Sequence, residues 1–376
     1  MQRGCLHFVW RQGIAGLMNE TMALTNETVS REVELQGPVF VLGAGFSRAI
    51  SARIPDLKNL SSAVWNRYAH RQKPDLGIRD AFGENIEDAL SFLAQPKPWV
   101  RESTQLQYRS LFLELTEDVA AVIGTAETDS LGDFASGAPG WVNQLLKYWH
   151  DNRCAVLTLN YDTMIERFGA EFSLGPDDRN ARPCTSWAIY PPFMTRAVTR
   201  SQTIIMGSPA PTFQLLKLHG SVNWFYSGRD TSYGETIYYV EAVGPEGFWT
   251  ANAKLAEARE RAAVSDKFPF IVPPVFDKTA LLTHESIRSI WSKAHLALRS
   301  ASRVIFVGYS LPWTDRTMLN FLRDSIKPDS LIEIVDLREE CLTHFRQSLG
   351  QAYQKISQSL SGENCIQELA KTIGTR

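Results

Sequence analysis

Short apolar runs alternate along the chain with longer stretches in which apolar residues recur every three or four positions. The short runs are apolar on both faces, as the strands of a buried parallel sheet must be. They predict six strands, at residues 39–42, 155–159, 214–218, 268–272, 303–307 and 331–335. Helical patterns follow three of these runs closely, at residues 161–172, 315–326 and 337–349. This alternation predicts an α/β fold with a doubly wound, Rossmann-like parallel sheet of about six strands.

A long interval between the first two predicted strands has helical periodicity only. Its apolar spacing predicts helices at residues 57–70, 86–93, 105–123 and 141–148. We therefore expect residues 56–150 to form a helical module inserted into the sheet domain. A loop at about 174–211 and a mixed segment at about 223–298 are two further expected insertions. The sheet domain then covers residues 37–345, between an N-terminal tail (1–36) and a C-terminal helix (346–376).

Composition and charge exclude several classes of function. Thirty-nine Lys and Arg residues against 41 Asp and Glu residues give a net charge of −2, so there is no general basic field to attract nucleic acid or an anionic membrane. The five cysteines are far apart and form no CxxC pair, so neither a disulfide framework nor structural zinc is expected. The apolar run at residues 5–10 is too short for a signal sequence or a membrane span. We expect a cytoplasmic protein without a metal.

The first predicted strand runs into the sequence GAGFS, residues 43–47. A glycine-rich turn between a strand and a helix lets backbone N–H groups approach a pyrophosphate, and the helix dipole favours its negative charge. A tight turn that binds no ligand would explain the same residues. The match to the dinucleotide fingerprint is incomplete, because Arg48 stands where that fingerprint has its third glycine. No acidic residue ends a second strand about twenty positions on, so a hydride-transferring domain is disfavoured.

Polar residues also follow the second and third predicted strands. Asn160 and Asp162 lie at a carboxyl strand end, where ligands of open α/β sheets bind, although Asp162 could equally cap the next helix. A histidine side chain ordinarily titrates near neutrality, so His219, which is followed by a glycine, is expected to suit a general base or a partner of a sugar hydroxyl. A structural imidazole is the alternative interpretation of His219.

The last two predicted strands end in similar clusters. Gly308 and Ser310 suit a second phosphate or ribose contact, and Asp336 could accept a hydrogen bond from a ribose hydroxyl. Turn chemistry explains Gly308 and Ser310 equally well. Because several strand ends of one sheet carry such clusters, the joint pattern indicates a single ligand crevice.

The ordered motifs resemble those of the sirtuin superfamily, and in particular the sirtuin-like NADase branch of prokaryotic antiphage defence systems. They are GAGFS (43–47), IPDL (54–57), LNYD (159–162), LHGS (218–221) and GYSL (308–311), followed by a strand that ends at Asp336. The resemblance covers roughly residues 37–345. It implies a sirtuin-like fold and NAD+ as the substrate.

The resemblance also implies a role for each motif. Asn160 would lie beside the nicotinamide ribose, Asp162 would contact the nicotinamide end, and His219 would be the catalytic histidine. The glycine loop would hold the pyrophosphate, and the loop after the fifth strand would lie on the adenosine side. The residues expected to contact NAD+ besides Asp162 are Gly43, Ala44, Gly45, Phe46, Ser47, Pro55, Asp56, Gly308, Ser310 and Asp336.

One departure from the sirtuins bears on the reaction. Protein-deacylating sirtuins carry two CxxC pairs after the His-Gly strand, whereas this chain has no cysteine between Cys184 and Cys341. One wall of the acyl-lysine channel is then missing, which favours water as the acceptor. We therefore expect an NAD+ glycohydrolase in which Asn160 positions the ribose or the water and His219 engages the ribose hydroxyls. The rings of Phe46 and of residues 224–226 are expected to wall the nicotinamide.

Two other functions remain open, and the resemblance adds expectations about partners. The first is a zinc-free deacylase or ADP-ribosyltransferase with a protein acceptor, and the second is a non-catalytic sensor that binds NAD or ADP-ribose. The resemblance implies an abortive-infection effector controlled by homo-oligomerisation or by a separately encoded partner, a hexameric ATPase or a short Argonaute protein. The N-terminal tail and residues 337–360 are candidates for oligomer contacts.

Overall fold

A six-stranded parallel sheet forms the centre of the fold. The computed structural model describes residues 37–134, 137–171, 195–197, 212–226, 237–240, 264–278, 282 and 284–373. Within them the sheet has the order β10-β9-β8-β1-β2-β4, and all its neighbouring strands are parallel. The strands are β1 (Val39–Leu42), β2 (Ala155–Thr158), β4 (Gln214–Lys217), β8 (Arg303–Val307), β9 (Leu331–Asp336) and β10 (Ile356–Ser361). The predicted α/β class is therefore confirmed.

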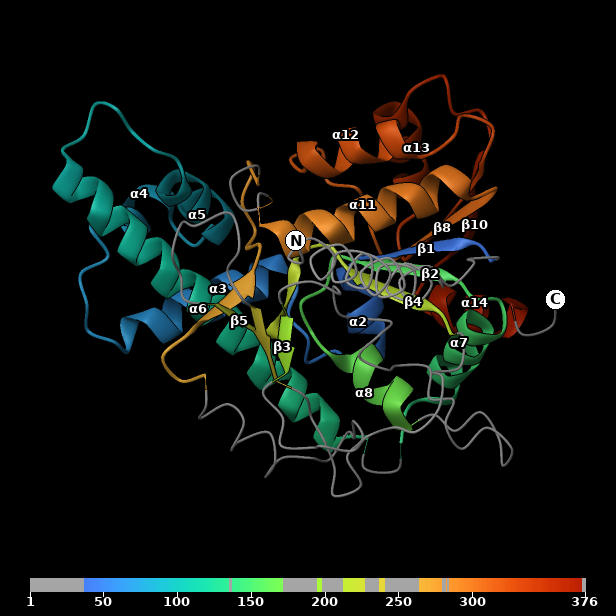
Figure 1. Cartoon of the computed structure of the whole chain (residues 1–376), viewed down its shortest axis with the longest axis horizontal. Helices are drawn as coiled ribbons and strands as arrows, with labels where there is room; N and C mark the ends of the chain where they lie inside the picture. Colours follow the sequence, from blue (N-terminus) through green and yellow to red (C-terminus); the bar gives the residue numbers. More distant parts are fainter. Residues whose placement is uncertain are drawn as a thin grey trace, which may run out of the picture. The chain divides into compact units, whose positions relative to one another are not determined.

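Helices cover both faces of this sheet (Figure 1). One face carries α11 (Glu285–Ser300), α12 (Arg316–Ser325) and α13 (Glu340–Leu349). The other face carries α2 (Ala44–Ile50), α7 (Gly140–Asp151), α8 (Met164–Glu171) and α14 (Cys365–Ile373). The helices that follow the neighbouring strands β1 and β8 thus lie on opposite faces. Ligands of open α/β sheets bind at such a switch point, outside the carboxyl ends of the strands.

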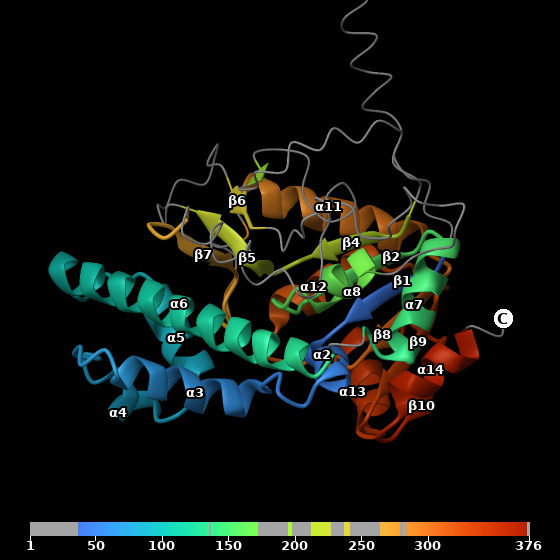
Figure 2. The same ribbon diagram turned by 90° about the horizontal axis from the view of Figure 1, so that it is seen from below.

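A helical module and a second sheet lie side by side (Figure 2). Their buried apolar side chains form a core separate from that of the main sheet. The module consists of α3 (Leu57–Ala69), α4 (Ile78–Phe82), α5 (Ile86–Ala94) and α6 (Glu102–Gly132). The second sheet has the order β3 (Thr195–Ala197), β6 (Ile237–Tyr239), β5 (Gly220–Tyr226) and β7 (Phe268–Ile271), with β5 antiparallel to β6 and β7. Val222 and Ile271 of this sheet pack with the apolar residues of the module. The module is therefore anchored on the strand that begins directly after His219.

The membership of the main sheet differs from the prediction in two strands. The predicted strand at residues 268–272 forms, but as β7 it pairs in the second sheet. Its place in the main sheet is taken by β10, which lies inside the segment predicted as a C-terminal helix (346–376). Buried and exposed positions alternate along β10, the two-residue period of an edge strand with one solvated face. The prediction of one continuous C-terminal helix was therefore wrong.

The inserted module is also shorter than predicted. The sequence placed α7 inside the insertion at 56–150, but its buried side chains Val142, Leu145 and Trp149 belong to the core of the main sheet. Periodicity identifies a helix without showing which core it faces. Helix α11, most of which falls in the predicted insertion at 223–298, likewise packs on the main sheet. The predicted tail (1–36) and most of the predicted loop at 174–211 lie outside the described residues.

A pair of leucines on α6 tests whether the module has its own core. Leu115 is fully buried in it, whereas Leu106 is largely exposed. We expect Leu115→Ala to lower the free energy of unfolding by about 2–5 kcal/mol, because it removes buried methyl groups and leaves a cavity. Leu106→Ala, the matched control, should change it by less than about 0.5 kcal/mol. Urea unfolding measures both, and equal effects would contradict the described packing.

Candidate functional site

Two glycine loops meet at the switch point of the main sheet. The Gly43 N–H donates to the Val307 carbonyl (3.1 Å), and the Gly45 N–H donates to the Gly308 carbonyl (2.9 Å). A Cβ atom on Gly43 would lie 2.6 Å from the Gly308 carbonyl oxygen, and Gly308 itself has a φ of +60°. Glycine is therefore required here by the close approach of two backbones. The predicted crevice motifs GAGFS and GYSL do lie side by side.

N–H groups of the glycine loop donate their hydrogen bonds within the chain. Besides Gly43 and Gly45, the Phe46 N–H donates within the chain, to the Gly43 carbonyl at 3.0 Å. These three N–H groups therefore serve the protein, which differs from the expectation that the turn directs them at a pyrophosphate. Ala44, between them, is exposed.

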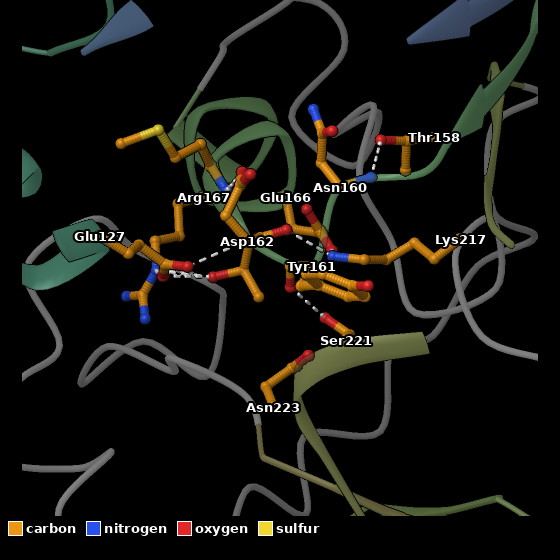
Figure 3. A network of polar contacts seen from close by, with 12 residues as sticks. Glu127, Thr158, Asn160, Tyr161, Asp162, Glu166, Arg167, Lys217, Ser221 and Asn223 are labelled. Atoms are coloured by element: carbon orange, nitrogen blue, oxygen red, sulfur yellow. Dashed lines mark hydrogen bonds and ion pairs between the residues drawn. The ribbon is translucent and has the colours of Figure 1, made fainter. Parts of the chain in front are cut away.

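Asn160 is tied to the glycine loop by its side-chain amide. The amide nitrogen donates to the Gly43 carbonyl (2.9 Å) and to the Ser47 hydroxyl (2.8 Å), while the Asn160 N–H donates to the Thr158 hydroxyl (Figure 3). The Oδ1 atom has no hydrogen-bond donor among the described residues. Asn160 is thus held by its amide nitrogen, and its carbonyl oxygen remains able to accept a hydrogen bond.

Asp162 lies behind Asn160 and is engaged by protein groups on both of its oxygens. Oδ2 accepts from the Ser47 hydroxyl (2.7 Å), and Oδ1 accepts from the N–H of Met164 at the start of α8 (3.2 Å). Burial raises the pKa of this carboxyl group, and the charge of Lys217 opposes that shift. The alternative interpretation of Asp162 as a helix cap is therefore confirmed. Ser47, expected to touch the cofactor, instead joins Asp162 to Asn160.

A fully buried lysine supports this segment from the neighbouring strand. Lys217, at the end of β4, donates to the Asp162 carbonyl, and its Nζ lies 2.8 Å from Oε1 of Glu166 on α8 (Figure 3). Desolvation opposes both buried charges, so the pair persists because its partners and hydrogen bonds are in place. Sequence reasoning missed Lys217, although a lysine between two leucines of a predicted strand was the available signal.

A second buried network connects the helical module to the same segment. Glu127 of α6 accepts from the Thr163 N–H (2.8 Å) and from the Thr163 hydroxyl (2.6 Å). It also pairs with Arg167 of α8, whose Nε lies 2.7 Å from Oε1 (Figure 3). All three side chains are buried. The module therefore holds the first turn of α8, directly after Asp162.

His219 follows β4, and two aromatic rings lie beside its imidazole. The ring centroids of Tyr161 and Trp291 each lie 6.4 Å from that of His219, which is only 6% exposed. The imidazole makes a hydrogen bond with the backbone of Leu159. Its Nε2 atom is buried and has no hydrogen-bond partner among the described residues. Since Nδ1 is left to donate to Leu159, Nε2 carries the lone pair.

The His219 imidazole is neutral at physiological pH. Burial is the largest cause, the charge of Lys278 adds to it, and Asp315 opposes it, so that the pKa is lowered to about 4. A fully satisfied structural imidazole would have partners on both nitrogens, whereas His219 has an unused acceptor. The geometry therefore fits a hydrogen-bond acceptor or general base.

The remaining predicted contacts lie at the same edge of the sheet or beside it. Asp56 caps α3, accepting from the Asn59 N–H (2.8 Å), and it pairs with Arg48 (2.7 Å). Asp336 ends β9 and accepts from the Arg338 N–H at 3.0 Å. Both carboxylates thus have protein partners. The other predicted contacts are at least partly exposed, and these are Ala44, Gly45, Pro55, Gly308 and Ser310.

The expected aromatic wall of the nicotinamide was wrong. The Phe46 side chain is fully buried and packs against two tryptophans of α7, in the core on one face of the main sheet. Trp224 is fully buried in β5, and Phe225 packs with Val240 in a small separate cluster. Composition shows that aromatic residues are abundant but not which way they point. The rings that do flank His219 are those of Tyr161 and Trp291.

The described residues contain neither a metal site nor a membrane helix. No group of three or more His, Cys, Asp or Glu side chains among them could hold a metal ion. None of the helices described is long and apolar enough to cross a membrane.

Comparisons with known proteins found similar solved structures only. No protein-family model matches the chain, and no curated protein does. A sirtuin solved to explain sirtuin substrate affinity is 17% identical, with a TM-score of 0.39 over 95% of this chain and 97% of that one. Sir2 bound to a propionylated peptide is 18% identical, with a TM-score of 0.37 over 95% and 96%. Sir2 with an inhibitor, 2′-O-acetyl-ADP-ribose and a deacetylated peptide is 16% identical, with a TM-score of 0.37 over 93% and 96%.

The buried pair under Asp162 gives a stability prediction. We expect Lys217→Met to lower the free energy of unfolding by about 3–5 kcal/mol, because it leaves the Glu166 carboxylate buried without its partner. Adding Glu166→Leu should recover part of the loss. Lys147→Met breaks an exposed pair with Asp151 and should cost less than about 1 kcal/mol. A Lys217→Met effect no larger than that of Lys147→Met, in urea unfolding, would refute the role of the pair.

His219 gives a pH prediction. An unfolded histidine titrates near 6.5, whereas the pKa of folded His219 is about 4. As the pH falls through this window, the unfolded chain takes up a proton that the folded chain does not, so the free energy of unfolding falls. We expect His219→Gln to remove a loss on the order of 3 kcal/mol across the window. Urea unfolding at several pH values tests this, and a His219→Gln variant with the wild-type pH dependence would contradict it.

Proposed function

We propose that the protein is an NAD+ glycohydrolase, which cleaves NAD+ to nicotinamide and ADP-ribose. The observation that carries the proposal is the pairing of Asn160 and His219 at one edge of the main sheet. Thr158 of β2 and Lys217 of β4 lie opposite each other in the sheet. Asn160 follows Thr158 by two positions, and His219 follows Lys217 by two positions. Asn160 Oδ1 and His219 Nε2 are thus two unused acceptors on neighbouring strand ends.

Cleavage of the N-glycosidic bond needs few protein groups. The bond breaks through an oxocarbenium-like ribose, and nicotinamide is a charged and therefore good leaving group. Two hydrogen-bond acceptors suit this step, because they can bind ribose hydroxyls, orient the sugar and place a water for attack. A neutral His219 also adds no positive charge beside the developing cation.

The motif order supports the placement of the rest of the substrate. We place the pyrophosphate beside the GAGFS loop and the adenosine toward Gly308, Ser310 and Asp336. The contact between the two glycine loops supports this arrangement, because it joins both binding segments at the switch point. Asp162 and Asp56, whose carboxylates have protein partners, then act by holding these loops.

The acceptor and the cellular role rest on the resemblance. The chain lacks the cysteine pairs that form the zinc module of the deacylases, which supports water as the acceptor. The motifs resemble those of the defence branch, which supports the role of an abortive-infection antiphage effector. Such an effector is controlled by homo-oligomerisation or by a separately encoded partner.

Nicotinamide release from NAD+ tests the proposal and the two residues. We expect Asn160→Ala and His219→Ala each to lower the rate at least about 100-fold, because each removes an acceptor at the ribose. His70→Ala, on the exposed end of α3, should retain the wild-type rate. Unchanged release in both site variants would refute the assignment, provided that thermal unfolding shows all the variants to be folded.

The products distinguish the alternatives. Free ADP-ribose formed without any protein or peptide supports hydrolysis. Nicotinamide release that depends on an acylated peptide or a modified protein would support the deacylase or ADP-ribosyltransferase. Tight binding of NAD+ in calorimetry without a product over hours would support a sensor.

A further inference from the structure

The chain leaves the main sheet directly after His219. This residue follows β4, the last strand in the order of the main sheet, which among the described strands of that sheet pairs only with β2. The next residue, Gly220, begins β5 of the second sheet and has a φ of +75°. A Cβ atom on Gly220 would lie 2.3 Å from the Phe270 carbonyl oxygen of β7. Among the described residues, groups outside the main sheet must therefore hold the His219 backbone on its outer side.

Trp291 of α11 holds the peptide group that precedes His219. Its indole Nε1 donates to the Leu218 carbonyl at 2.9 Å. The indole also lies beside the imidazole, with 6.4 Å between the ring centroids. The ring of Phe321 on α12 packs edge-on against the indole, with 4.7 Å between the centroids. Packing between two helices thus fixes the indole, and its N–H in turn fixes the residue after the end of β4.

Tyr161 holds the peptide group that follows His219, through one intermediate residue. The Val272 N–H donates to the His219 carbonyl at 2.8 Å, and the Tyr161 hydroxyl donates to the Val272 carbonyl at 2.7 Å. The Tyr161 ring also lies beside the imidazole, again with 6.4 Å between the centroids. Tyr161 directly follows Asn160 in the chain. These hydrogen bonds therefore also connect the two segments that carry the candidate residues.

We propose that Trp291 and Tyr161 are positioning residues, which fix the backbone on both sides of His219 and thereby direct Nε2 toward a ribose hydroxyl or the attacking water. An acceptor works only within hydrogen-bond reach of its target, and a misplacement of about 1 Å can cost about 100-fold in rate. The direction toward the substrate rests on the proposed function, whereas the fixing of the imidazole does not.

Nitrogen-15 NMR of the histidine rings in the full chain, at neutral pH, measures the positioning without a substrate. The signals of His219 are assigned by their loss in His219→Gln. In the wild type we expect one neutral form with the proton on Nδ1, because the ring donates to the backbone of Leu159. Trp291→Phe keeps a ring and removes the N–H donor. We expect it to add a second form, with the proton on Nε2, because the less constrained imidazole does not keep the Leu159 hydrogen bond in every molecule.

Two further variants separate positioning from packing. Tyr161→Phe removes only a hydroxyl, so it should fold even where Trp291→Phe does not, and it should also add the second form. Trp149 is buried in the core on the other face of the sheet, and its Nε1 has no hydrogen-bond partner among the described residues. Trp149→Phe, the matched control, should lower stability in urea and leave the His219 signals unchanged. The wild-type form alone in the folded Trp291 and Tyr161 variants overturns the proposal, as does a second form in Trp149→Phe.

The kinetics of nicotinamide release connect the positioning to the reaction. We expect Trp291→Phe and Tyr161→Phe each to lower kcat about 10-fold and to change KM less than about twofold, because a misdirected acceptor affects the transition state more than binding. Trp149→Phe should keep the wild-type kcat. A second ring form in a protein that releases no nicotinamide would refute the proposed function and leave the fixing of the imidazole standing. Release at the wild-type kcat in a variant that shows the second form would overturn the inference alone.

Discussion

The close approach of two backbones at the switch point is the constraint on which the candidate site depends. Gly43 and Gly45 contact Gly308 so closely that side chains at these positions would collide with main-chain atoms. The contact holds the Gly43 carbonyl where the Asn160 amide reaches it, and Ser47 then completes the link to Asp162. The orientation of Asn160 is therefore a consequence of loop packing within the chain.

Buried charges brought in by the inserted elements surround this centre. Glu127 comes from the helical module and binds Thr163, directly after Asp162. Lys278 comes from the loop after β7 and pairs with Asp315, at the start of α12. Buried ion pairs add little net stability compared with apolar packing, because desolvation offsets their attraction. Their positions around one edge of the sheet are better explained by orientation and charge control. The module and the second sheet thus contribute to the site as well as to the core.

The sequence predicted five of the six strands of the main sheet, all but β10. It also predicted that Asn160 and His219 follow strand ends at one edge, because parallel strands of apolar residues place their carboxyl ends together. It did not predict the pairs Lys217–Glu166 and Lys278–Asp315, whose partners are distant in the chain and meet only through the topology. Nor does helical periodicity show that Phe46 faces α7. The direction in which a side chain points, and its partners from distant parts of the chain, depend on the packing of the core. Local sequence patterns do not show either of them.

The low pKa of His219 has two physical causes, burial of the imidazole and the positive charge of Lys278. Burial is the larger cause, and the rings of Tyr161 and Trp291 lie beside the imidazole. The charge of Lys278 is the smaller cause, and it acts only while Asp315 holds the ammonium in place. Asp315 itself acts on the ring in the opposite direction to Lys278, so burial is the cause that decides the neutral state of His219.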